Sequence, residues 1–273
     1  MADAAAPAPK VTTATLRARK GAAEKIAVVT AYDVVFARLA DDAGLDVILV
    51  GDSLGMVVQG ERSTLPVTLD DMVYHTRIVS RGVRRAHLVA DMPFMSYQAS
   101  IEDGLRAAGR LIKEGRAEAV KLEGGVAVAE LVRRLVAAGI PVMGHVGMTP
   151  QSVHEFGGFK IQGRTDDQRA RIVEDARAIA DAGAYAIVVE TVPQTVAAEV
   201  TSAVPAVTIG IGAGRACDGQ VMVMHDLLGL EPAWKPRFVR RYAEMGQAVA
   251  AAFKTYAEDV RAGRFPSDEE SYD

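Results

Sequence analysis

The sequence predicts an α/β protein that folds as a single-domain (β/α)8 TIM barrel, with an N-terminal helix and a long C-terminal helix. Eight short apolar segments alternate with helical patterns, an order that gives a parallel sheet with right-handed crossovers. Eight such units favour a closed barrel over an open, doubly wound sheet, and no Gly-x-Gly-x-x-Gly turn follows the first strand. The 273 residues, 49% of them hydrophobic, are in the range of one barrel domain.

The segment 47–55 shows the pattern that the strands share. Four apolar residues, three of them β-branched, run into Gly51, Asp52 and Ser53. Such a run favours a strand that is buried on both faces, as in a parallel sheet. The expected strands are residues 26–30, 47–50, 87–91, 119–123, 141–145, 185–190, 206–210 and 221–224.

Helical spacing of apolar residues and capping residues predict the intervening helices. Gly44 ends one helix as a C-cap, Thr68 begins another as an N-cap, and Ser100 with Asp103 resembles a capping box. The expected helices are a short one within 11–24, then 34–43, 69–79, 100–115, 128–138, 166–182, 193–203 and 237–261. We expect residues 1–10 to be a disordered tail, 11–264 the catalytic barrel domain, and 265–273 an acidic C-terminal tail.

The composition excludes several classes of partner. A net charge of −4 without a basic block argues against nucleic acid, and arginines at helical spacing fit solvated helix faces. No apolar run approaches the roughly 20 residues of a membrane span, and residues 1–9 lack the pattern of a secretory signal. The single cysteine, Cys217, excludes an intrachain disulfide, favours an inert thiol and fits a cytoplasmic location.

Polar side chains at the ends of the expected strands are the candidate functional residues. If the strands close into a barrel, these residues converge on its C-terminal mouth, where barrel enzymes carry their active sites. They are Asp33, Asp52, Asp91, Glu123, His145 and Glu190. Any one of these acids alone is as well explained as a helix N-cap.

Asp52, Asp91 and Glu123 follow three consecutive strands, which the helix-cap explanation fits less well. Crowded carboxylates raise one another's proton affinity unless a cation neutralises them. An all-oxygen set of this kind suits a hard divalent ion, and we expect Mg²⁺.

Lys121 and Glu123 are two residues apart on one strand and therefore share a face. The ammonium would pair either with neighbouring carboxylates or with a substrate carboxylate. His145 is a ligand, an acid–base group or a hydrogen-bonded core histidine, and the sequence leaves these alternatives open.

Glu190 ends the sixth expected strand, apart from the three consecutive acids, and is placed to act as a general base. The loop 149–164 contains Gly157, Gly158 and Gly163 and is long enough to form a lid. Glycines 210, 212 and 214 fit either an anion cradle or, more simply, a tight turn.

The residues also resemble a known family, the ketopantoate hydroxymethyltransferases, over roughly residues 12–265. The matching segments, in order, are 30–33, 49–55, 63–67, 90–94, 120–125, 144–151, 156–160, 211–214 and 224–226. The resemblance implies a Mg²⁺-dependent transfer of a hydroxymethyl group from 5,10-methylenetetrahydrofolate to 3-methyl-2-oxobutanoate. The product would be 2-dehydropantoate, an intermediate of pantothenate biosynthesis.

The same resemblance implies roles for individual residues. Asp52, Asp91 and Glu123 would be the metal-site acids, and Glu190 the proton acceptor. Asp52, Ser53, Asp91 and Lys121 would contact the oxo acid. The family also implies a cytoplasmic homo-oligomer, expected to be a homodecamer.

Two other function classes compete with this interpretation. A Mg²⁺-dependent oxo-acid lyase of the isocitrate-lyase-like group would use a similar barrel, but such lyases usually carry a catalytic cysteine in a lid, whereas Cys217 follows the seventh expected strand. A non-catalytic binding protein would be expected to have lost one of the site residues.

Overall fold

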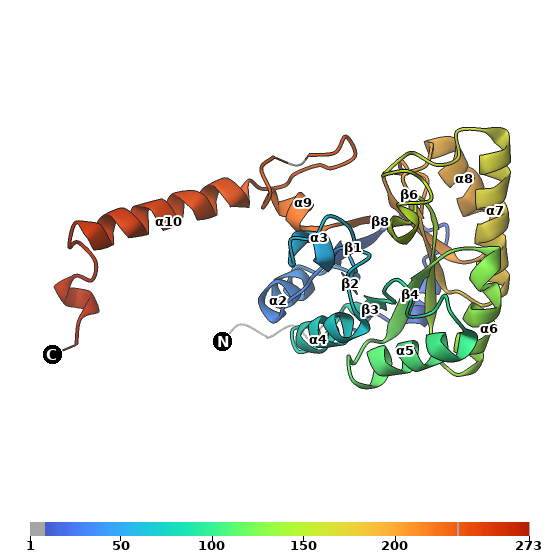
Figure 1. Cartoon of the computed structure of the whole chain (residues 1–273), viewed down its shortest axis with the longest axis horizontal. Helices are drawn as coiled ribbons and strands as arrows, with labels where there is room; N and C mark the ends of the chain where they lie inside the picture. The colour runs from blue at the N-terminus through green and yellow to red at the C-terminus, as the bar shows by residue number, and fades with distance from the viewer. Residues whose placement is uncertain (1–8, 234, 273) are drawn as a thin grey trace. The chain divides into compact units, whose positions relative to one another are not determined.

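The computed structural model describes residues 9–233 and 235–272 and contains a closed barrel of eight parallel strands (Figure 1). The strands follow one another around the barrel in chain order, and β1 closes the ring by pairing with β8. They are β1 Ile26–Thr30, β2 Val47–Val50, β3 His87–Asp91, β4 Ala119–Glu123, β5 Val142–Gly147, β6 Ala186–Glu190, β7 Val207–Ile211 and β8 Gly219–Met222. The expected (β/α)8 fold is therefore confirmed.

Helices follow most strands and lie outside them, with α4 to α8 visible around the barrel in Figure 1. The longer barrel helices are α2 Val34–Asp42, α4 Leu69–Val79, α5 Ile101–Lys113, α6 Ala129–Ala137, α7 Asp166–Asp181 and α8 Gln194–Ala203. Shorter ones are α1 Thr13–Arg17 and α3 Leu54–Val57, and 3-10 turns are η1 Val126–Val128 and η2 Pro150–Ser152. In the described part of the chain, every helix is too short or too polar to cross a membrane.

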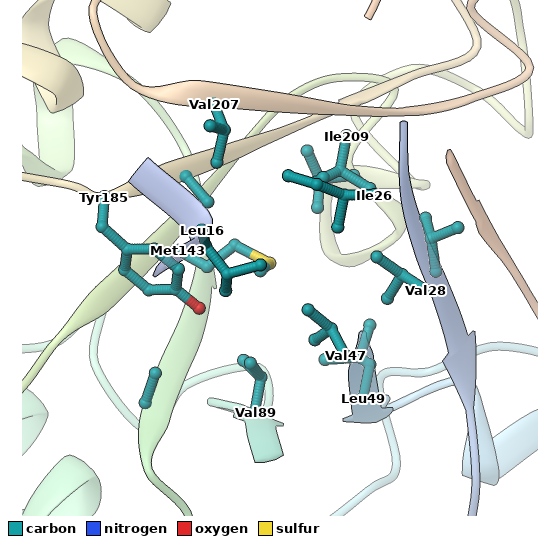
Figure 2. Close-up of a cluster of buried hydrophobic side chains, with 14 of the residues drawn as sticks. Leu16, Ile26, Val28, Val47, Leu49, Val89, Met143, Tyr185, Val207 and Ile209 are labelled. Atoms are coloured by element: carbon teal, nitrogen blue, oxygen red, sulfur yellow. The ribbon is translucent and has the colours of Figure 1, made fainter. Parts of the chain in front are cut away.

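Apolar side chains fill the barrel interior (Figure 2). Ile26, Val47 and Val207 come from the first residues of their strands, and Leu16 of α1 packs into the same cluster. Because α1 contributes to the cluster at the start of the strands, it covers the N-terminal end of the barrel. The polar residues of the opposite, C-terminal end are thus left to form the site.

Two elements near the C-terminus differ from their expected limits. The last strand was expected at 221–224, but β8 begins at Gly219 because its backbone pairs there with both β1 and β7. Met224 instead begins the short helix α9 Met224–Leu228. The long helix α10 spans Met245–Arg261 rather than 237–261, since the preceding segment forms turns and the Tyr242 N–H donates to the Leu227 carbonyl of α9.

The structure divides into two compact units, with the boundary between Met222 and Val223. The first contains the whole barrel, and the second contains α9, α10 and the 3-10 turn η3 Asp268–Glu270. The expected domain of residues 11–264 covers the barrel and most of the second unit, and its status as one catalytic domain stays a prediction. Of the expected N-terminal tail, residues 1–8 lie outside the described residues; the expected acidic tail is exposed over 265–272.

A buried carboxylate ties α2 to the start of β3. Asp41, which is 5% exposed, accepts hydrogen bonds from the backbone N–H groups of Arg84 (3.0 Å), Arg85 (3.0 Å) and Ala86 (2.6 Å). These donors lie in the αβ connection and have no strand partner on that side. The carboxylate therefore satisfies three backbone groups that burial would otherwise leave without partners.

We expect Asp41→Ala to lower the free energy of unfolding by about 3 kcal/mol, because three backbone donors lose a charged acceptor at once. Its neighbour Asp42 offers a matched control, since it is half-exposed and pairs only with the Arg84 guanidinium. Asp42→Ala should cost less than about 1 kcal/mol. Urea denaturation of the three proteins measures both effects, and equal losses would contradict the anchoring role of Asp41.

Candidate active site

Three carboxylates meet at the C-terminal mouth of the barrel. Asp52 follows β2, whereas Asp91 and Glu123 are the last residues of β3 and β4, and all three are at least 94% buried. The backbone N–H of Asp52 donates to Asp91 Oδ2 at 3.1 Å, which places the first two acids side by side. The three acids expected from consecutive strands are therefore brought together.

Lys121 supplies a positive charge inside this cluster. The register of β3 and β4 pairs Asp91 with Lys121, and the Lys121 Nζ donates to Asp91 Oδ1 at 2.8 Å. Burial disfavours the charged ammonium, but the carboxylates of Asp91, Glu123 and Asp52 outweigh it and raise the pKa of Lys121 above its usual value. The lysine thus stays protonated and shares the interior face with Glu123, as the two-residue spacing predicts.

The negative charge of the cluster is not fully neutralised by this one lysine. Burial raises the pKa of Asp52 well above its usual value, and the nearby carboxylates of Asp91 and Glu123 raise it further. Lys121 acts in the opposite direction without cancelling these effects. The site therefore has the excess of negative charge that a bound cation would compensate.

His145 lies between two carboxylates. The register of β4 and β5 pairs it with Glu123, and its ring nitrogens lie 3.4 Å from Glu123 Oε1 and 3.2 Å from Glu190 Oε2. Both are ion-pair distances without the alignment of hydrogen bonds. Burial and Lys121 oppose protonation, but Glu123 and Glu190 outweigh them and raise the pKa of His145 to about 9. Of the alternatives left open, this position favours a charged member of the site over a hydrogen-bonded core histidine.

Glu190 and Ser53 are more open than the buried acids. The Glu190 side chain, at the end of β6, retains 19% exposure, compared with 4% for Glu123. Ser53 precedes α3 and its Oγ lies 2.8 Å from the Tyr32 hydroxyl. Both residues can therefore meet a small molecule that enters the mouth from solvent.

Two residues of the site were not found by sequence reasoning. Gln151, in η2, hydrogen-bonds both Asp52 and Glu123, and the Tyr97 hydroxyl contacts Gln151 and the backbone of Glu123. Gln151 lies in a segment that resembles the family. The side chains of Gln151 and Tyr97 are neutral, however, so the search for charged residues at strand ends did not find them. Their position depends on how the loops fold over the mouth.

The donor set fits a divalent cation that keeps part of its water shell. Within residues 9–233 and 235–272, no three His, Cys, Asp or Glu side chains are arranged closely enough to ligate one ion together. Asp91 pairs with Lys121, while Asp52 and Glu123 accept hydrogen bonds from Gln151. Glu123 Oε1 remains buried without a hydrogen-bond partner. Mg²⁺, which is held by one or two carboxylates plus water, suits such a set.

Other sequence candidates lie away from this cluster or have structural roles. Asp33 caps α2, since its Oδ1 accepts from the N–H groups of Val35 and Phe36. A Cβ at Gly214 would lie 2.6 Å from Gln194 Cβ, so this glycine permits a close turn against α8, as the simpler interpretation predicts. Cys217 is buried, and burial raises the pKa of its thiol, which fits an inert residue.

Comparison with known proteins identifies close relatives over nearly the whole chain. Residues 10–268 match the family model of ketopantoate hydroxymethyltransferase. The 3-methyl-2-oxobutanoate hydroxymethyltransferase of Carboxydothermus hydrogenoformans is 53% identical over 263 residues, covering 96% of this chain and 95% of that protein. The enzyme of the same name from Moorella thermoacetica is 54% identical over 263 residues, covering 96% of this chain and 98% of that protein.

More distant solved structures share the barrel. A phosphonopyruvate hydrolase in complex with oxalate and Mg²⁺ aligns with a TM-score of 0.62 at 15% identity, covering 94% of this chain and 92% of that one. A 2,3-dimethylmalate lyase aligns with a TM-score of 0.59 at 19% identity, covering 95% of this chain and 91% of that one. At these identities the likeness concerns the fold alone.

Proposed function

The chain belongs to the ketopantoate hydroxymethyltransferase family, and from this premise we propose how its barrel mouth performs the reaction. The enzyme adds a hydroxymethyl group to 3-methyl-2-oxobutanoate, giving the 2-dehydropantoate required for pantothenate biosynthesis. We propose 5,10-methylenetetrahydrofolate as the one-carbon donor. The observation that carries the assignment of the site is the convergence of Asp52, Asp91, Lys121 and Glu123, with Glu190 at the open edge.

Binding of the oxo acid is assigned to Asp52, Ser53, Asp91 and Lys121. The Lys121 ammonium carries the positive charge that a carboxylate substrate requires, and Asp91 fixes its position. The Ser53 hydroxyl, held by Tyr32, can donate a hydrogen bond to a substrate oxygen. Asp52 and Asp91 would contact the substrate when a bound cation compensates part of their negative charge.

The metal is proposed to be Mg²⁺, held by Asp52, Asp91 and Glu123. Support comes from the raised pKa of Asp52, which is due first to burial and then to the neighbouring carboxylates, and from Glu123 Oε1, which is buried without a hydrogen-bond partner. When bound, Mg²⁺ supplies a Lewis acid that stabilises negative charge developing on the ketone oxygen.

Glu190 is the proposed proton acceptor. The carboxylate takes the proton from C3 of the oxo acid, and the electron pair of that C–H bond becomes the enolate. Lys121 stabilises this negative charge, and the C3 carbon then forms a bond to the methylene carbon of the folate. As this bond forms, one methylene–nitrogen bond breaks and its nitrogen takes the electron pair. Water then replaces the second nitrogen and supplies the hydroxyl oxygen. The two nitrogens take up the proton from Glu190 and one proton from water, which releases tetrahydrofolate. His145, 3.2 Å from Glu190, holds the base in place.

We expect Glu190→Gln to slow the exchange of the C3 proton of 3-methyl-2-oxobutanoate with deuterium by about 10²- to 10⁴-fold, since the amide cannot accept that proton. Binding of the oxo acid should change little. Exchange is followed by proton NMR in deuterated buffer, with Glu199→Gln on the partly exposed face of α8 as the matched control.

Undiminished exchange in Glu190→Gln would remove this residue from the role of base. The same experiment distinguishes the competing enzyme class, because an oxo-acid lyase would cleave its substrate without a folate donor. Formation of 2-dehydropantoate only when methylenetetrahydrofolate is added is the result expected here.

A second substitution tests the metal site. Asp91→Asn removes one negative charge, and we expect it to weaken Mg²⁺-dependent binding of the oxo acid by about tenfold or more. Titration calorimetry with and without Mg²⁺ gives the ratio of the two affinities, and Asp42→Asn on the surface serves as control. A ratio equal to that of the wild type would count against Asp91 as a metal-site acid.

We also propose that the protein self-associates, as a homodecamer. Helix α10 has no buried residue, yet it carries an apolar stripe at helical spacing. The stripe consists of Met245, Val249, Phe253, Tyr256 and Val260. An exposed stripe of this length is typical of a protein–protein interface, and a second copy of the chain is the proposed occupant.

Phe253→Glu should shift the wild-type assembly toward smaller species, because it places a charge in the middle of the stripe. Thr255→Glu introduces the same side chain on the other face of α10 and should leave the assembly unchanged. Sedimentation velocity resolves the species. A monomeric wild type, or identical profiles for both variants, would contradict the role of the stripe.

A cytoplasmic location completes the proposal. The single, buried Cys217 suits a reducing compartment. Recovery of the enzyme with the membrane or periplasmic fraction of lysed cells would contradict it.

A further inference from the structure

Gln151 makes more contacts with the acidic cluster than its neutral side chain suggests. Its Nε2 donates to Asp52 Oδ2 and to the Met92 carbonyl, both at 2.9 Å. Its backbone N–H donates to Glu123 Oε2 at 2.9 Å. The residue is 6% exposed and lies in η2, which begins three residues after the end of β5. Gln151 therefore contacts two of the proposed metal-site acids, Asp52 and Glu123, and the backbone of Met92, which follows the third acid, Asp91.

The orientation of the carboxamide is fixed by its other end. Gln151 Oε1 accepts from the Tyr97 hydroxyl at 2.8 Å and from Gln98 Nε2 at 3.0 Å. The opposite orientation would aim the carbonyl oxygen at the Met92 carbonyl, which only accepts, and the amide nitrogen at Gln98 Nε2, which only donates. The network thus holds the donor toward Asp52.

Each acid is held through one of its two oxygens. Gln151 occupies Asp52 Oδ2 and Glu123 Oε2, while Glu123 Oε1 is buried without a hydrogen-bond partner. Outer hydrogen bonds of this kind orient a ligand and fix which oxygen it offers. Asp52 follows β2 and Glu123 ends β4, so a single residue sets the spacing between acids from two separate strands.

We infer that Gln151 is the positioning residue of the divalent-cation site, holding Asp52 and Glu123 in the arrangement that receives the ion. The inference rests on the proposed function, since it concerns the same metal site. Gln151 touches the acids rather than the reacting atoms and acts through them. Loss of its side chain should weaken cation binding before it affects the chemical step.

The test is Mn²⁺ binding, measured by electron paramagnetic resonance with saturating 3-methyl-2-oxobutanoate. Gln151→Met keeps the volume and the backbone N–H but removes the carboxamide, and we expect the dissociation constant for Mn²⁺ to rise about 10- to 100-fold. High Mg²⁺ should largely restore kcat, because the catalytic groups themselves are unchanged. A merely structural role would leave activity low at every Mg²⁺ concentration.

Gln220→Met is the matched control, since the Gln220 side chain is exposed and donates only to the Gly214 carbonyl. It should bind Mn²⁺ like the wild type. Tyr97→Phe is a second variant that retains Gln151 but removes the hydroxyl that donates to its Oε1. We expect a smaller weakening in the same direction, which keeps the inference testable if Gln151→Met does not fold.

The outcomes separate this inference from the proposed function. Wild-type Mn²⁺ affinity in both Gln151→Met and Tyr97→Phe, with a wild type that binds Mn²⁺, would overturn the role of Gln151 and leave the proposed reaction intact. Absence of Mn²⁺ binding in the wild type would overturn the proposed metal site and this inference with it.

Discussion

Buried negative charge is the constraint on which the mouth of this barrel depends. Asp52, Asp91 and Glu123 are held out of water, where ionised carboxylates are costly unless a partner neutralises them. Lys121 compensates part of the charge, yet burial and then the carboxylates of Asp91 and Glu123 still raise the pKa of Asp52. In the proposed function, a hard cation would compensate the remaining negative charge when the oxo acid binds.

The barrel tolerates this concentration of buried charge because its apolar core and its acidic residues lie at opposite ends. Apolar side chains fill the interior and α1 covers the end where the strands begin, so the fold is stabilised away from the acids. The parallel register then decides which polar residues are neighbours. It pairs Asp91 with Lys121 and Glu123 with His145, so that each acid of these two strands lies beside a basic residue. The residues that stabilise the fold and those proposed for catalysis therefore lie at opposite ends of the barrel, as in other barrels of this type.

The pattern of the sequence was sufficient for the barrel and for its charged residues. Short, mostly apolar runs that lead into an acid located β2, β3, β4 and β6, because a strand buried on both faces leaves a recognisable apolar segment. The limits of β8 and the start of α10 were predicted less accurately. The limits of β8 depend on its backbone pairing with β1 and β7. The start of α10 depends on the preceding segment, which hydrogen-bonds to α9, a helix that the local sequence pattern does not indicate.

The fold class, the acids that gather at the mouth and, through the resemblance, the family could all be predicted from the order of residues along the chain. How those acids are held could be seen only in the folded structure. Gln151 and Tyr97 carry no charge and follow no periodic pattern, yet the loops fold them against Asp52 and Glu123. Charged residues and the periodicity of hydrophobic residues can be recognised along the sequence without knowledge of the fold. The hydrogen bond from Gln151 to Asp52 joins residues 99 positions apart, so it forms only after folding has brought them together.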